Sequence, residues 1–185
     1  KDIYTTSVDY DAHAEKTQTF FKVVQNKLLW AISKQTAAEL VARRANAGLP
    51  FMGMLSYDKN IERRITPQEA ATAKNYLNSE EIKALGLLVE QYLAFAEAQA
   101  QQQIAMTMND WIVKLDAILT LNGRELLTHA GTISADLAKE VSAIELRKLH
   151  TRLIAEEKEQ SLDELERDLE SLAKAKLSGK KGGDK

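Results

Sequence analysis

The side chains of this sequence that could do chemistry lie in short stretches far apart along the chain, not in one motif. The first stretch gathers the carboxylates Asp9, Asp11 and Glu15, which could bind a cation or act as acid and base. A calcium loop, however, spaces its oxygen ligands around a glycine turn, and that pattern is absent here. Acidic residues also favour the N-terminus of a helix. We therefore expect these carboxylates to cap and solvate the first helix, with Asp11 as its N-cap.

Metal-ion and nucleophilic chemistry lack a recognisable pattern in this chain. The histidines, His13, His129 and His150, are not spaced as helical metal ligands, and no HExxH motif occurs. The chain has no cysteine, which excludes thiolate catalysis and cysteine-bound zinc. It also has no glycine-rich phosphate loop and no GxSxG elbow. The sequence therefore predicts no metal, no cofactor and no catalytic residue.

Two helical stretches carry neighbouring polar residues that could still contribute to a pocket. Adjacent residues on a helix point in different directions, so neither stretch forms a cluster by itself. Convergence of these side chains from separate helices would favour an enzyme acting on a nucleotide or nucleic acid. Scattered or purely capping positions would count against that alternative. The members of this candidate polar pocket are Asp9, Tyr10, Gln25, Asn26, Lys27, Arg44, Lys74, Asn75 and Tyr76.

The stretch RRANAGLPFMGM, residues 43–54, interrupts the helical pattern and is too apolar for a solvated loop. Its basic pair and the pair at 63–64 could meet phosphates, but no aromatic stacking residues alternate with them, so we expect solvated helix edges. We expect Gly48 to end the preceding helix and Pro50 to keep the chain extended. Phe51, Met52 and Met54 would then anchor the segment on the helical core.

The elements that must position these residues are helices. Apolar residues recur at helical spacing over residues 12–34, 36–45, 67–77, 79–102, 108–127 and 135–177. Thr36, Thr66, Asn78 and Thr107 are the expected N-caps, and Thr66 is followed by Pro67 at the first helical position. The sequence predicts an all-α fold with five or six helices in one bundle-like domain and a long C-terminal helix.

The last helical pattern carries a second leucine stripe. One set of leucines at helical spacing comprises Leu146, Leu149 and Leu153. A second set, with 3-4-3 spacing and shifted by one residue relative to the first, begins at residue 162. A capping box at Ser161 could break the helix there. We expect a helical core over 1–133, a long helix over 134–177 and a flexible tail over 178–185. The helix would project from the domain or form a homo-oligomer, a dimer, through Leu162, Leu165, Leu169 and Leu172.

Composition sets outer limits on the function. The chain has 185 residues, enough for one domain with or without an extension, and a net charge of −2, so no overall field attracts nucleic acid. No apolar run approaches the roughly 20 residues that span a bilayer, so no membrane partner is expected. The lack of cysteine fits the cytoplasm. The first residue is Lys1 and no signal pattern follows, so we expect an upstream part of a longer protein to be missing.

Several blocks together resemble the C-terminal region of the bacterial RhuM family of virulence-associated or mobile-element proteins. The blocks lie between Asp2 and Ile133 and read DIYTTSVDYD, FFKVVQNKLLWAI, TAAELVARRANAGLPFMGM, AKNYLNSEEI, LVEQYLAFAEAQA and MTMNDWIVKLDAIL. The chain departs from the family pattern at Leu29, where a histidine is common, and at Gly86 and Gly123, where larger polar residues are common.

The resemblance implies a functional context. Family members carry an upstream segment similar to a helix-turn-helix or phage-type DNA-binding domain, and the C-terminal region has no established catalytic activity. The expected function is therefore an interaction, oligomerisation or effector module of a DNA-binding regulator, which reaches nucleic acid through the upstream segment.

Overall fold

The computed structural model describes residues 7–11, 13–57 and 64–179, with side chains up to residue 172, and this part of the chain contains helices and no strand. The predicted all-α fold with a long C-terminal helix is confirmed. None of the described helices combines the length and apolar character needed to cross a membrane. The elements are α2 (Glu15–Ser33), α3 (Ala37–Arg44), the 3-10 turn η1 (Pro50–Gly53), α4 (Pro67–Ala70), the 3-10 turn η2 (Ala73–Tyr76), α5 (Ser79–Gln101), α6 (Met108–Leu121) and α7 (Ala135–Gly179).

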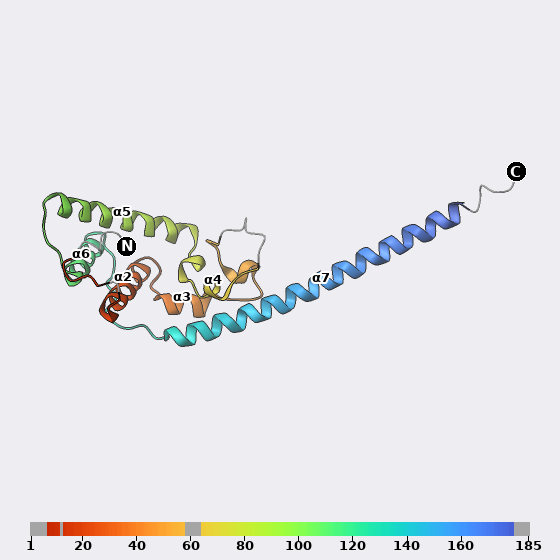
Figure 1. Cartoon of the computed structure of the whole chain (residues 1–185), viewed down its shortest axis with the longest axis horizontal. Helices are drawn as coiled ribbons and strands as arrows, with labels where there is room; N and C mark the ends of the chain where they lie inside the picture. Colours follow the sequence, from red (N-terminus) through yellow and green to blue (C-terminus); the bar gives the residue numbers. More distant parts are fainter. Residues whose placement is uncertain (1–6, 12, 58–63, 180–185) are drawn as a thin grey trace.

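The helices bury two apolar clusters that meet along α2. One cluster joins α2, α5 and α6 through residues such as Phe20, Tyr92 and Trp111. The other joins α3, η1 and η2 to the first half of α7, with Leu40 and Tyr76 fully buried. Figure 1 shows the body formed by these elements at one end and α7 running along it and far beyond it.

The predicted helix starts are confirmed where a capping side chain and its return partner lie within four residues. Thr36, Thr66, Asn78 and Thr107 each accept a hydrogen bond from the backbone N–H three residues on, and the acidic residue at that position reaches back. Each box satisfies two backbone donors that a helix N-terminus otherwise leaves unpaired.

Several predicted boundaries are wrong because periodicity does not register backbone turns. The first helix begins at Glu15, not residue 12, and Asp11 instead accepts a hydrogen bond from the His13 N–H at 2.9 Å. It ends at Ser33, since Lys34 adopts a left-handed φ of 56°. The helix expected over 67–77 divides into α4 and η2, and α6 ends at Leu121 instead of 127.

The segment predicted to anchor itself on the core does so with a different backbone. Met52 and Met54 are 0% and 1% exposed, which confirms them as anchors. Gly48 does not end α3, which already stops at Arg44, and Pro50 begins a 3-10 turn instead of keeping the chain extended. This turn lets Met52 point inward.

The turn at η1 needs an unusual backbone. Phe51, Met52 and Gly53 all have positive φ, at 50°, 58° and 78°. A β-carbon added to Gly53 would lie 2.7 Å from the backbone oxygen of Arg44. Glycine at this position is therefore required both by φ and by the close approach of the end of α3.

The N-terminus of α3 is fixed by a buried carboxylate. Glu39 is 2% exposed and its Oε2 accepts the Thr36 N–H at 2.9 Å. Its Oε1 accepts the Thr132 N–H at 2.8 Å and the Thr132 hydroxyl at 2.6 Å. Thr132 lies just before α7, so one side chain joins the start of α3 to the root of the long helix. Gly131 packs against Thr36, where a β-carbon would come within 2.9 Å.

The long helix is continuous through the predicted break point. Ser161 donates its hydroxyl to the Glu157 carbonyl at 2.9 Å, as a serine inside a helix can, instead of capping a new helix. The helix continues to Gly179, two residues past the expected end at 177. The rest of the predicted tail, 180–185, lies outside the described residues.

Replacing Gly53 by alanine should destabilise the fold by about 2 kcal/mol or more, because the new methyl group meets the Arg44 carbonyl in a left-handed backbone. Urea unfolding measures the change. The matched control is Gly86→Ala in α5, where an added β-carbon meets nothing within 4 Å. That variant should gain about 0.5–1 kcal/mol by the helix preference of alanine. Equal effects of the two variants would contradict the close approach at Gly53.

The Glu39 carboxylate should give the stability a distinct acid dependence. Burial alone would raise its pKa, but hydrogen bonds from the Thr132 hydroxyl, from the Thr36 and Thr132 amides and from the Thr36 side chain outweigh burial and lower the pKa to about 2. The charged form is therefore favoured in the folded state. Its contribution is fully present above pH 4.5 and is lost as the pH falls towards about 2.

Glu39→Gln should cost about 2 kcal/mol at pH 7 in urea unfolding, because it weakens a buried cap and the contacts with Thr132. The stability difference from the unchanged chain should narrow between pH 4.5 and about 2. Asp110→Asn is the control: it alters the corresponding box on α6, where the carboxylate interacts, within the described residues, with Thr107 and Lys114 of the same helical segment, and should cost less. If the stability difference between Glu39→Gln and the unchanged chain did not depend on pH, the lowered pKa of Glu39 would be contradicted.

Candidate functional site

The first two members of the candidate polar pocket anchor the chain that precedes α2. Asp9 Oδ1 accepts the Met108 N–H at 2.9 Å, at the start of α6. The Tyr10 N–H donates to the Ser7 carbonyl at 3.1 Å, and the Ser7 hydroxyl accepts the Trp111 indole N–H at 3.0 Å. The Asp9 and Ser7 contacts tie the segment before α2 to α6, whereas the Tyr10 N–H closes a local turn. Asp9 therefore caps α6 and not the first helix, for which it was predicted.

Asn26 and Lys27 hold α2 against two neighbours. Asn26 Oδ1 accepts the Ala37 N–H at 2.9 Å, which satisfies a backbone donor at the start of α3. Lys27 Nζ lies 2.8 and 3.0 Å from the two carboxylate oxygens of Asp116 on α6. Both side chains border a cavity of about 390 Å³ that also touches His129, but each already has a structural partner.

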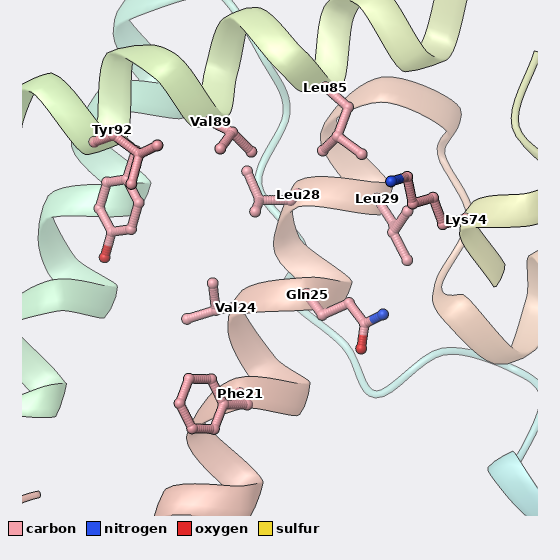
Figure 2. Close-up of a pocket in the computed structure, with 10 residues that line it drawn as sticks. Phe21, Val24, Gln25, Leu28, Leu29, Lys74, Leu85, Val89 and Tyr92 are labelled. Atoms are coloured by element: carbon pink, nitrogen blue, oxygen red, sulfur yellow. The ribbon is translucent and has the colours of Figure 1, made fainter. Parts of the chain in front are cut away.

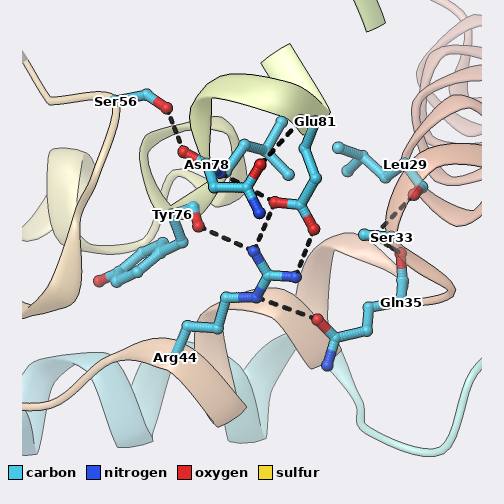
Figure 3. Close-up of polar contacts among 9 residues, drawn as sticks. Leu29, Ser33, Gln35, Arg44, Ser56, Tyr76, Asn78 and Glu81 are labelled. Carbon is cyan, nitrogen blue, oxygen red and sulfur yellow. Dashed lines mark hydrogen bonds and ion pairs between the residues drawn. The ribbon is translucent and has the colours of Figure 1, made fainter. Parts of the chain in front are cut away.

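Arg44 at the end of α3 joins three segments of the body. Its guanidinium pairs with both carboxylate oxygens of Glu81 at 2.7 Å and donates to the Tyr76 carbonyl at 3.0 Å and to Gln35 Oε1 at 3.1 Å (Figure 3). The hydrogen bonds from Arg44 lower the pKa of Glu81. Four of the five N–H donors of the planar group are used within the fold and its charge is paired with Glu81, so this arginine is occupied by structural contacts.

Asn75 and Tyr76 are likewise engaged with backbone. Asn75 Nδ2 donates to the Glu69 carbonyl at 3.0 Å, and the Tyr76 hydroxyl donates to the Ala70 carbonyl at 2.7 Å. Tyr76 is fully buried, and burial raises the pKa of its hydroxyl to about 12. A hydroxyl that keeps its proton and has no access to solvent is unsuited to act as a base.

Gln25 and Lys74 are the two candidate residues that border the same apolar pocket. It lies between α2 and α5, has a volume of about 420 Å³ and is lined mainly by aliphatic and aromatic side chains (Figure 2). Both polar side chains are exposed at its edge. The structure thus brings Gln25 and Lys74 to one pocket and Asn26 and Lys27 to another, but it does not gather the nine candidates in one place. Apart from Gln25 and Lys74, they make cap, ion-pair or backbone contacts. This distribution counts against the alternative function, that of an enzyme acting on a nucleotide or nucleic acid.

Two carboxylates that join distant segments were not among the predicted site residues. Glu39 completes the capping box of Thr36, the expected N-cap, and it also binds Thr132. Glu145 on α7 accepts the Ala47 N–H at 2.8 Å and pairs with Lys148 at 2.6 Å; the hydrogen bonds from Ala47 and Lys148 lower its pKa. A capping motif signals the first role of Glu39, but no sequence spacing reveals the contacts with Thr132 and Ala47. Over the described residues, no group of three or more His, Asp or Glu side chains could hold a metal ion.

The predicted oligomer interface lies on the part of α7 that leaves the body. Residues 154–172 are all exposed, and the body's last described contact is an ion pair of Arg64 with Glu157 at 3.6 Å. The stripe leucines Leu162, Leu165, Leu169 and Leu172 are 62%, 56%, 58% and 60% exposed. At about 100° per residue, their stripe is centred about 150° around the helix from the leucines that pack on the body.

The comparisons with known proteins give a family for this chain. No curated protein and no solved structure was found to match it. The model of the Virulence protein RhuM family matches residues 1–157. The match therefore extends past the blocks that carry the resemblance and includes the half of α7 that packs on the body. The chain belongs to the Virulence protein RhuM family.

Proposed function

We propose that this chain is an interaction and oligomerisation module of a bacterial regulatory protein associated with virulence or a mobile element, in which the α7 arm pairs with the arm of a second copy. The observation that carries the proposal is the exposed leucine stripe, Leu162, Leu165, Leu169 and Leu172, on a helix that continues about 30 Å past the body. Apolar side chains at 3-4-3 spacing form the seam of a coiled coil.

The charges beside the stripe favour a parallel pair. If Leu162 and Leu169 occupy a positions and Leu165 and Leu172 occupy d positions, Glu166 takes an e position. An antiparallel pair aligned on these leucines would place Glu166 of one copy beside Glu166 of the other. A parallel pair would place it beside Ser161, which avoids this like-charge contact. The stripe is short, so we expect weak association that depends on concentration.

A parallel pair would place both bodies at the same end of the arms. The family resemblance implies a DNA-binding segment upstream, and two such segments carried side by side would suit a DNA site with two halves. We propose that nucleic acid is reached through that segment, because this chain has a net charge of −2 and the guanidinium of Arg44 is paired with Glu81.

Replacing Leu165 and Leu169 together by glutamine should abolish self-association, since glutamine keeps helix propensity but removes the apolar seam. Sedimentation equilibrium across the micromolar range should give a monomer–dimer equilibrium for the unchanged chain and a monomer for the double variant. Both should have the same helical circular dichroism, because neither leucine contacts the body.

Arg167→Gln is the matched control, because residue 167 lies on the other side of the helix from the stripe and should leave dimerisation intact. The proposal would be contradicted if the unchanged chain were still a monomer at the highest concentration of the sedimentation experiment. So would a dimer that persists when both leucines are replaced.

A further inference from the structure

We propose that the pocket between α2 and α5 binds an amphipathic anion, a linear aliphatic chain that ends in a carboxylate or a similar acidic group. The proposal concerns the body and does not depend on pairing of the arms. Its basis is a pocket that is apolar over most of its length and carries towards one end an amide and an ammonium group that forms no ion pair with the described residues.

The apolar part of the pocket reaches into the space between the two helices. Val24, Leu29 and Tyr92 line it and are only 6%, 3% and 3% exposed, so the pocket extends down to buried side chains. Leu85 and Val89 line the α5 side together with Tyr92, across from Val24 and Leu29 of α2 (Figure 2). The volume of about 420 Å³ lies in the range of small-molecule sites. A narrow alkyl chain can reach this depth, whereas a helix of about 10 Å diameter would rest on the rim.

The polar part of the pocket lies towards one end. Figure 2 shows Lys74 and the Gln25 amide on the side away from Phe21 and Tyr92. Lys74 makes no ion pair with any residue that the structure describes, and it borders aliphatic side chains such as Leu29 and Leu85. An acidic head group would supply the missing counter-charge, and Gln25 could donate a hydrogen bond to it.

The groups that shape the pocket are held by contacts of the body. The Tyr92 hydroxyl donates to the Trp111 carbonyl at 2.7 Å, which fixes the ring in the pocket wall. The Lys74 carbonyl accepts the Leu77 N–H at 3.2 Å, and neighbouring Asn75 is bound to Glu69, so the η2 backbone that carries the lysine is constrained. The site is thus largely formed before a ligand arrives, which limits the entropy lost on binding.

The test uses sodium decanoate, below the concentration at which it forms micelles, and the complete chain. Calorimetric titration should show saturable binding at one site, and amide chemical shifts should change along α2, η2 and α5. Hexanoate should bind more than about tenfold more weakly, because it lacks buried methylene groups. Lys74→Gln should weaken decanoate binding by about fivefold, as expected for an exposed ion pair.

Lys83→Gln is the matched control: it removes another exposed lysine, on α5, that does not line the pocket, and should leave the affinity unchanged. Absence of saturable binding would overturn the proposal, as would shift changes confined to other helices. Equal losses in the two lysine variants would overturn the role of Lys74 as the head-group contact. Binding of an amphipathic helical peptide but not of decanoate would assign the surface to a protein partner and would overturn the small-ligand site.

Discussion

The buried carboxylate of Glu39 is the contact on which the arrangement of the body and the arm depends. It closes the N-terminus of α3 and at the same time binds Thr132, so the linker before α7 cannot leave α3 without exposing an unpaired backbone donor. Asn26 adds a bond from α2 to the same helix end. Helix α2 and the distant segment at Thr132 therefore both meet the first turn of a helix only eight residues long.

This constraint explains why so many polar residues of the chain are structural. A short helix cannot bury enough apolar surface to fix its own position, so α3 is also held at its far end by Arg44, which pairs with Glu81 of α5 and the Tyr76 carbonyl. Polar side chains used in this way are not free to bind substrate. Two features of the described residues are not filled by these contacts, namely the apolar pocket beside Lys74 and the exposed leucine stripe of α7.

The sequence predicted those parts of the fold whose causes are local. The capping boxes at Thr36, Thr66, Asn78 and Thr107 are complete within four residues, so composition and spacing reveal them. Met52 and Met54 were recognisable as anchors because an apolar side chain must be buried whatever the turn. The left-handed backbone at Phe51 and Met52 could not be recognised from the sequence, since neither residue type favours it. It occurs together with two tertiary features, the close approach of Gly53 to Arg44 and the burial of Met52.

The candidate site could not be predicted in the same way, because the partner of a polar side chain is chosen by tertiary structure. Asp9 meets Met108 and Lys27 meets Asp116, each about half the chain away, and no periodicity relates such positions. The two sets of leucines on α7 are an exception, since the spacing of residues along a continuous helix determines the side of the helix on which each side chain lies. One set faces the body and the other faces away, so a single rigid helix can bind its own domain and still present a separate apolar face. Because the root of α7 is fixed by Thr132 and Glu145, that second face has a defined orientation relative to the body.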